Sequence, residues 1–165
     1  MKKLLALVMA LIMLLSSAAV AEEIVYEQFF DGTWVQFEDG FEIYLPSEWL
    51  ELEVTDEMLE GGIFYAVMSP DGAYTCQMIW SALDAEYTYE EALAEVDAIY
   101  PGAELLEVNG IGLICFADAE NDILGFAALD GAEPGLYMFF FTPMADENLQ
   151  LLASVIASSL RLIEE

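Results

Sequence analysis

The acidic segment DAENDILG, which begins at Asp118, contains the residues best suited to bind a metal ion. Asp118, Glu120 and Asp122 alternate there, and carboxylate oxygens are the ligands that Ca²⁺ prefers. A calcium loop of the EF-hand type needs glycine at its sixth position and glutamate at its twelfth, where this segment has Ile123 and Leu129. We interpret the segment as an acidic β-turn. Loose binding of calcium by Asp118, Glu120 and Asp122 is the metal prediction.

Two tryptophans are the candidates for contact with an organic ligand. Trp34 and Trp49 stand near the ends of predicted strands, where an exposed indole could stack on a sugar ring. The competing interpretation is core packing, because large aromatic side chains supply much of the burial in a small domain. Trp80 alternates with apolar neighbours in AYTCQMIW and is assigned to the core. The sequence favours packing for all three and keeps Trp34 and Trp49 as ligand-binding candidates.

The residue types that the chain lacks exclude most common active sites. It contains no histidine, and no lysine follows Lys3. Ser-His and Cys-His nucleophilic pairs and Schiff-base chemistry are therefore closed to the processed chain. A glycosidase needs two carboxyl groups roughly 5 to 10 Å apart, but among 31 acidic residues many pairs meet that distance by chance. We predict a protein that is not an enzyme and that holds no cofactor.

Cys76 and Cys115 are the only cysteines, and two interpretations of them remain open. An exported protein can join them in one disulfide, whereas buried free cysteines behave as small apolar residues. A disulfide needs the two Cβ atoms within about 4.5 Å of each other. Because of this requirement, the sequence favours free thiols.

The N-terminal segment has the order of a secretory signal peptide. Lys2 and Lys3 precede the apolar run 4–15, and small residues end in the Ala-Val-Ala motif that closes at Ala21. The apolar run is shorter than the roughly 20 residues of a membrane-spanning helix. We therefore expect cleavage after residue 21. No cysteine follows the small residues, so we expect a secreted, extracytoplasmic protein with no lipid tether and no membrane contact.

The charge of the processed chain restricts its partners. Removal of residues 1–21 from the 165-residue chain leaves 144 residues, with 31 acidic side chains and Arg161 as the only base, a net charge of −30. Nucleic acid and anionic lipid are excluded, because their binding depends on lysine and arginine. We expect cations or a basic protein surface as partners. The hydrophobic fraction of 58% excludes a disordered acidic chain.

Crowding of so many carboxylates predicts an effect of pH on stability. Like charges raise carboxyl pKa values in the folded state, so mild acidification should stabilise the fold. Added salt or calcium should raise the melting temperature at neutral pH, because both reduce the repulsion.

The elements that position these residues are mostly strands. An acidic lead, residues 22–33, precedes a single domain at 34–165. Period-two alternation and the turn dipeptides Asp-Gly and Asn-Gly predict antiparallel strands. The strands are expected at 33–37, 41–45, 63–69, 73–82, 103–108, 111–119, 122–130 and 135–143.

Two amphipathic helices and one helical turn complete the pattern. Thr55 begins the turn, and Thr88 with Glu91 forms a capping box for a helix that stops at Pro101. The last helix is expected to begin at Thr142 and to run through Arg161, whose charge would then suit the negative end of the helix dipole.

The segment LYMFFF, residues 136–141, is apolar at every position. A strand covered on both faces has this pattern. We expect it in the middle of the sheet, with a helix over each face, in a monomer. The alternative is an exposed edge that pairs with another chain.

This order of elements resembles the PsbP-like fold. The resemblance covers residues 34–163 and rests on the strand GFEIYLPSEW, the V-x-S-P-D-G hairpin, a helix in mid-chain, an Asn-Gly hairpin and a closing helix. The family includes a photosystem extrinsic protein, a Ran-binding nuclear transport factor and exported bacterial proteins of the DcrB type. It implies that Trp49 packs against the sheet and that the protein binds other proteins and does not catalyse a reaction.

These observations together predict an α+β fold with a mainly antiparallel sheet of seven or eight strands flanked by two helices. The predicted function is that of a secreted interaction or ligand-binding module with an acidic surface. The alternative is a carbohydrate-binding module that uses Trp34 or Trp49.

Overall fold

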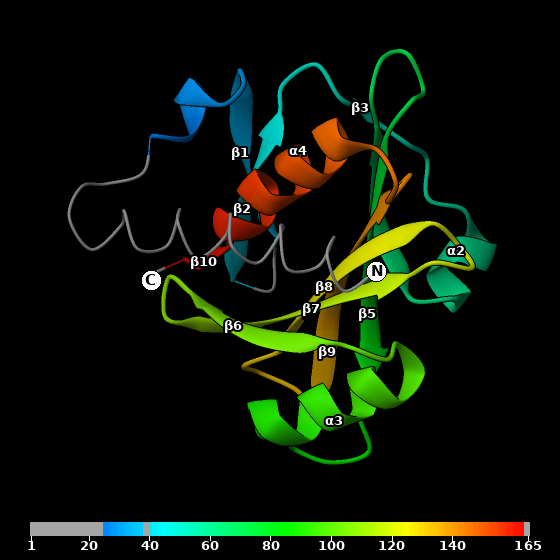
Figure 1. Ribbon diagram of the computed structural model, residues 1–165, viewed down its shortest axis with the longest axis vertical. Helices are drawn as coiled ribbons and strands as arrows, with labels where there is room; N and C mark the ends of the chain where they lie inside the picture. The colour runs from blue at the N-terminus through cyan, green and yellow to red at the C-terminus, as the bar shows by residue number, and fades with distance from the viewer. Residues whose placement is uncertain (1–24, 38–39, 164–165) are drawn as a thin grey trace.

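The computed structural model describes residues 25–37 and 40–163, and Figure 1 traces their course. The predicted signal peptide, residues 1–21, and residues 22–24 of the acidic lead lie outside the described residues. The elements are η1 (Tyr26–Gln28), β1 (Gly32–Phe37), β2 (Phe41–Pro46), β3 (Leu50–Glu51), α2 (Asp56–Glu60), β4 (Ile63–Met68), β5 (Thr75–Ala82), α3 (Tyr89–Ile99), β6 (Glu104–Val108), β7 (Ile111–Asp118), β8 (Ile123–Leu129), β9 (Gly135–Thr142), α4 (Glu147–Ser158) and β10 (Arg161–Leu162).

Seven strands form one antiparallel sheet in the order β3-β4-β5-β9-β8-β7-β6. The segment LYMFFF lies in β9, the central strand, as its sequence predicts. Its side chains belong to two separate clusters, with Tyr137, Phe139 and Phe141 in one and Leu136, Met138 and Phe140 in the other. Alternate side chains of a strand point to opposite faces. The sheet is therefore covered on both faces.

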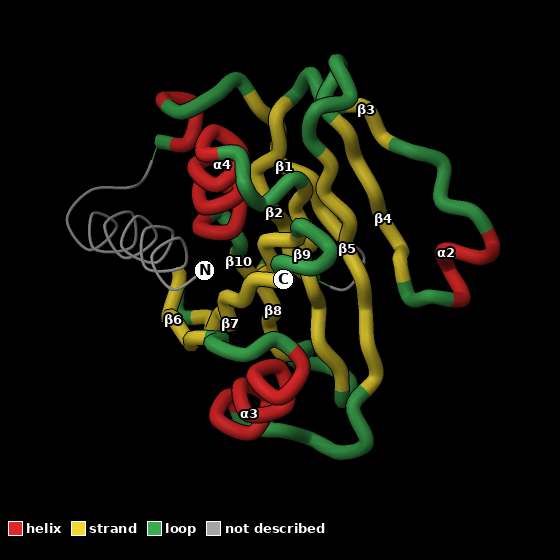
Figure 2. The backbone as a smooth tube through the Cα atoms, turned by 45° about the vertical axis from the view of Figure 1, so that its right-hand side comes forward, coloured by secondary structure: helices red, strands yellow, loops and turns green. Residues whose placement is uncertain are grey.

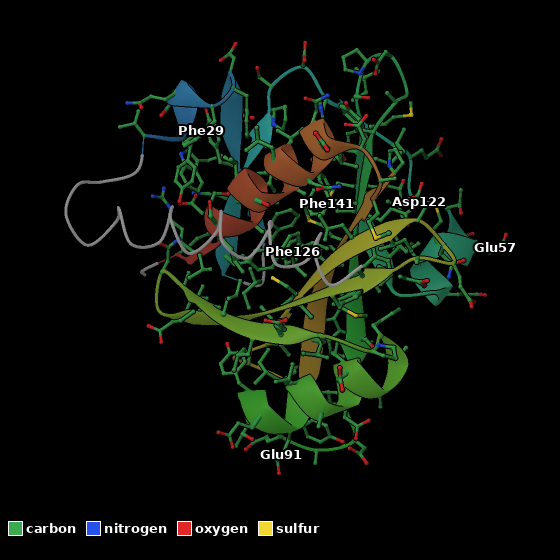
Figure 3. All side chains as sticks on the ribbon, in the orientation of Figure 1. Phe29, Glu57, Glu91, Asp122, Phe126 and Phe141 are labelled. Atoms are coloured by element: carbon green, nitrogen blue, oxygen red, sulfur yellow. The ribbon has the colours of Figure 1, made fainter. Side chains whose placement is uncertain are left out.

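The two longer helices supply these covers. Helix α4 packs on β8 and β9, where Leu149 and Ile156 join the cluster that contains Phe126 and Phe141. Figure 3 shows these two phenylalanines beneath α4. Helix α3 packs on β6 and β7, and Ala92 joins the other cluster. The predicted α+β fold, with helices on both faces of an antiparallel sheet, is confirmed.

Helix α3 begins where the capping box predicts. The Thr88 side chain accepts a hydrogen bond from the Glu91 amide at 3.3 Å, and the Glu91 carboxylate accepts one from the Thr88 amide at 2.8 Å. At the other end, the Tyr100 ring stacks on Phe116 with 4.4 Å between ring centroids. Two backbone donors are satisfied at the start and one aromatic pair holds the end, which fixes α3 against β7.

The first two strands differ from the prediction, because they form a second sheet. Strand β2 lies between β1 and β10, and all pairs are antiparallel. Figure 2 shows this small sheet next to α4. Phe41 reaches the main sheet, where its ring lies 4.8 Å from that of Tyr137. The single predicted sheet is in fact two sheets that share one core.

The closing helix begins later than predicted. Thr142 ends β9, and its hydroxyl lies 2.7 Å from that of Thr75 on β5. The N-cap is Asp146, whose carboxylate accepts hydrogen bonds from the amides of Asn148 and Leu149. Pairing with β5 takes precedence over capping for Thr142, so the predicted start of this helix is wrong.

The same helix also ends earlier than predicted. It stops at Ser158, where the Ser158 and Ser159 hydroxyls bond to carbonyls three residues back. The Ser159 hydroxyl also accepts a hydrogen bond from the Tyr44 amide at 2.8 Å. Arg161 then lies in β10 and does not cap the helix. Strand pairing with β2 thus overrides the helical period in the last residues.

Cys76 and Cys115 are buried free thiols on different strands of the main sheet. Strands β9 and β8 separate β5, which carries Cys76, from β7, which carries Cys115. At about 4.8 Å between neighbouring strands, β5 and β7 lie about 14 Å apart, beyond the reach of a disulfide. The structure therefore confirms the free thiols that the sequence favours.

The short helix η1, which precedes β1, packs onto the domain. Tyr26 is buried, and its hydroxyl donates a 2.8 Å hydrogen bond to the Ser158 carbonyl at the end of α4.

In residues 25–37 and 40–163, no helix combines the length and the apolarity that a membrane span requires.

Candidate functional site

Arg161 is held by partners within the chain. In the small sheet it stands opposite Glu42, which in turn stands opposite Gln36. The Arg161 Nε lies 2.6 Å from one Glu42 oxygen, and Gln36 donates to the other at 3.0 Å. The guanidinium carbon lies 3.7 Å above the Trp34 ring. The single base of the described residues is therefore paired with a carboxylate and an aromatic face.

Burial of Glu42 opposes its ionisation, yet its pKa is lowered. Hydrogen bonds from Gln36 and Arg161 and the charge of the guanidinium outweigh the effect of burial. Glu42 is therefore an ionised structural partner, and a raised-pKa acid of the kind that glycosidases use is not found there.

The two candidate tryptophans lie in different parts of the core. Trp34 is half-buried, and its ring centroid lies 5.6 Å from that of Tyr26, in a T-shaped pair, and 5.4 Å from that of Tyr44, in a tilted pair. The Arg161 guanidinium covers one face of its ring. Trp49 is half-buried and packs on the main cluster. The structure does not bring the two indoles together in one aromatic cluster.

The acidic segment forms the turn between β7 and β8. The Asp118 carboxylate accepts hydrogen bonds from the Glu120 and Asn121 amides and from the Asn121 side chain. Asp122 instead accepts from the Ala145 amide at 3.2 Å. Within the described residues, no group of three or more His, Cys, Asp or Glu side chains has the arrangement of a metal site. Loose calcium binding by this turn stays a prediction.

The pKa shifts of two cysteines and three carboxyl groups in the described residues have structural causes. Burial raises the pKa of the Cys76 and Cys115 thiols, so neither is a ready thiolate. Hydrogen bonds from neighbouring residues lower the pKa of Asp71, Glu91 and Asp118. At these positions the direction is opposite to the one that carboxylate crowding predicts, because local hydrogen bonds dominate.

An apolar hollow lies where the small sheet meets the main sheet. It encloses about 260 Å³. Its wall includes Phe41, Ile111, Tyr137, Phe139, Leu160 and Leu162. Leu162 is 69% exposed and stands at the rim. This arrangement leaves an apolar recess with one large aliphatic side chain open to solvent.

An acidic hollow adjoins the first one. It encloses about 290 Å³, and its wall includes Leu83, Glu86, Tyr87, Asp130, Glu133 and Pro134. Residues 129–132 line both hollows. The turn between β8 and β9 is therefore a common wall, with an apolar recess on one side and carboxylates on the other.

Asp130 and Trp80 fix the shape of that wall. One Asp130 oxygen accepts from the Ala132 and Glu133 amides, and the other accepts from the Trp80 indole at 3.0 Å. Burial opposes the ionisation of Asp130, but these hydrogen bonds, with one from Tyr137, hold its pKa below its usual range. Asp130 is an ionised group that organises the turn.

Comparison with known proteins supports a fold assignment. The solution structure of cyanobacterial PsbP (CyanoP) from Synechocystis sp. PCC 6803 superposes with a TM-score of 0.56 at 14% identity, over 80% of this chain and 92% of that one. The chain has a PsbP-like fold. A crystal structure from Bacteroides thetaiotaomicron VPI-5482 gives a TM-score of 0.52 at 14% identity, and this chain spans half of that chain's length. No family model and no curated protein sequence matches.

The PsbP-like fold agrees with the resemblance in the sequence, but the two hollows were not predicted. Phe41 and Leu162 are far apart in the chain and meet only because β10 pairs with β2. The Asp-Gly pair at 130–131 marks a turn in the sequence, but no local pattern indicates a recess beside it. Trp80 was assigned to the core, and its hydrogen bond to Asp130 gives it a second role as a positioning residue.

Proposed function

We propose that the protein is a secreted, non-enzymatic module whose acidic surface binds a basic protein. The observation that carries the proposal is the charge imbalance: the processed chain has 31 acidic side chains against Arg161, and Glu42 neutralises that one base. A surface of this kind attracts a cationic partner over a distance of about 10 Å at moderate salt and repels polyanions. The protein binding implied by the PsbP-like resemblance supports the same proposal.

The carbohydrate-binding alternative has less support. A sugar-stacking platform needs an open aromatic face, and the guanidinium of Arg161 occupies one face of Trp34. Trp49 packs on the main cluster. Neither geometry favours a sugar platform over packing.

Affinity capture from the producing cell's envelope and culture fluid tests the proposal. The captured protein, once identified and purified, should be rich in lysine and arginine, should bind directly, and should be released by about 0.5 M salt, because its contacts are between exposed charges. The matched control is the same protein with exposed carboxylates changed to amides, which should capture less. A purified partner that is acidic, or binding that salt does not affect, would contradict the proposal.

A second measurement tests the absence of catalysis. If the purified protein turns over any substrate, and a single carboxylate-to-amide change abolishes that turnover while the fold is kept, the proposal is wrong.

A further inference from the structure

We infer that the two hollows form one docking site, and that its occupant is an extended segment of a basic protein with an apolar side chain next to a lysine or arginine. This inference rests on the proposed function and adds the place of binding and the chemistry of the partner.

The apolar hollow has the size and lining for one large side chain. A cavity of roughly 150 Å³ lined by aliphatic and aromatic side chains binds benzene, and this hollow encloses about 260 Å³. A phenylalanine, leucine or methionine side chain therefore fits. Leu162, at the rim, loses its exposure to water when such a side chain enters, which favours binding.

The acidic hollow supplies the second contact. Glu86 and Glu133 are exposed, and Asp130 is held ionised by the hydrogen bonds of its turn. Within residues 25–37 and 40–163, no lysine or arginine lines either hollow. Arg161, the single base of the described residues, begins β10 directly after Leu160 and pairs with Glu42. Glu86 and Glu133, beside the apolar recess, are thus available to a cation from outside.

The common wall explains why both contacts belong to one segment. Residues 129–132 line both hollows, so a single turn of the backbone separates one hollow from the other. Consecutive residues of an extended peptide are about 3.4 Å apart and project to opposite sides. An apolar residue and its basic neighbour can therefore lie on the two sides of the wall. Trp80 and Asp130 hold that wall in place before the partner arrives.

Charge complementarity selects the occupant. An acidic segment would be repelled by Glu86, Asp130 and Glu133. A neutral apolar segment would remove water from these carboxylates without giving them a positive charge in return. A basic segment gains from both hollows. The same argument disfavours a second copy of this chain, whose net charge after processing is −30.

A short synthetic peptide tests the inference directly. The probe is acetyl-Lys-Phe-Lys-amide, titrated into the ¹⁵N-labelled processed protein and followed by amide chemical shifts. We expect the shifts to concentrate at residues 129–133 and 160–163. Acetyl-Lys-Gly-Lys-amide, which lacks the apolar side chain, and acetyl-Glu-Phe-Glu-amide, which reverses the charge, should each bind at least about tenfold more weakly.

Matched variants locate the two contacts. Leu162→Asp should weaken the Lys-Phe-Lys peptide at least about tenfold. Leu50→Asp is the control, because Leu50 is an exposed leucine in the other two-residue edge strand, and it should have no effect. The double variant Glu86→Gln with Glu133→Gln should weaken binding about threefold or more at low salt.

The control for the charge contacts is Glu48→Gln with Glu120→Gln. Glu48 follows the end of β2 that is remote from Phe41, and Glu120 lies at the end of β8 that is remote from Asp130. This double variant removes the same charge and should leave binding within about twofold of the wild type.

The outcomes separate the two proposals. If both lysine peptides bind equally and the shifts spread over the acidic surface, the docking site is wrong and the proposed function stands. If no cationic peptide binds, the proposed function is wrong as well. Loss of binding in Leu50→Asp equal to that in Leu162→Asp would also overturn the docking site.

Discussion

Arg161 and Glu42 meet at 2.6 Å across the neighbouring strands β10 and β2, although 119 positions separate them in the chain. The Glu42 side chain is 11% exposed and that of Arg161 46% exposed. This ion pair closes the small sheet and fixes the course of the chain after α4. It therefore also sets the position of Leu162 at the apolar hollow.

Glu42→Gln should destabilise the protein in a pH-dependent manner. The folded-state pKa of Glu42 is lowered, so its contribution to stability is complete above the unfolded value of about 4.3 and is lost as the pH falls through the folded value. We expect a loss of about 1–3 kcal/mol at pH 7, because a buried hydrogen-bonded group loses its charge-assisted bonds. Urea unfolding across a pH series measures it.

Glu48→Gln is the control for this change, since Glu48 is exposed in the loop after β2. It should alter stability by less than about 0.5 kcal/mol. A difference between wild type and Glu42→Gln that stays constant from pH 7 to well below the unfolded pKa would show that the ion pair contributes nothing.

Tyr44→Phe should be neutral or stabilising. The Tyr44 side chain is buried, and within the described residues its hydroxyl has no hydrogen-bond partner. A buried polar group without a partner costs about 1–3 kcal/mol, so its removal should raise stability by up to about 1 kcal/mol. Tyr26→Phe is the matched control in the neighbouring ring, because the Tyr26 hydroxyl donates to Ser158. It should lower stability by about 1 kcal/mol, and the same sign for both variants would refute the prediction.

The protein should contain two free thiols that react slowly in the folded state. Cys76 and Cys115 are buried on strands separated by two others, and burial raises the pKa of both thiols. A thiol assay should detect both residues after denaturation without reductant and neither of them rapidly beforehand. Detection of no thiol in the denatured, unreduced protein would mean a disulfide that this fold does not permit.

Calcium binding by the β7–β8 turn should be loose, with a dissociation constant of about 1 mM or weaker. Asp118 and Asp122 already accept hydrogen bonds from backbone amides, so few lone pairs remain for an ion. Isothermal titration of the wild type, of the Asp118→Ala/Asp122→Ala double variant and of Glu120→Gln tests this. Glu120→Gln keeps the turn's hydrogen bonds, and binding that is unchanged in both variants would place the calcium elsewhere.

Local patterns in the sequence predicted most of the fold. The all-apolar LYMFFF segment indicates a central strand, and the Thr88–Glu91 capping box marks the start of α3. Each depends on residues that are close in the chain, and each is found where the pattern places it.

The errors are long-range. The helical period continues past Ser158, but Arg161 instead pairs with Glu42 on a strand near the other end of the chain. Thr142 has the type and position of a helix cap, but its hydroxyl meets Thr75 on β5. The hollows depend on the same pairings, because Leu162 and Phe41 come together only through β10 and β2. Contacts between residues that are far apart in the chain produce no periodic pattern in a single sequence.

Contacts between the bound Lys-Phe-Lys peptide and the protein's methyl groups are the most direct test of the docking site. The measurement is the set of nuclear Overhauser effects from the peptide's phenyl ring. We expect contacts with the methyl groups of Leu162, Ile111 and Ala128, which line the apolar hollow. Contacts with Leu50 or Leu151 instead, on exposed surface elsewhere, would contradict it.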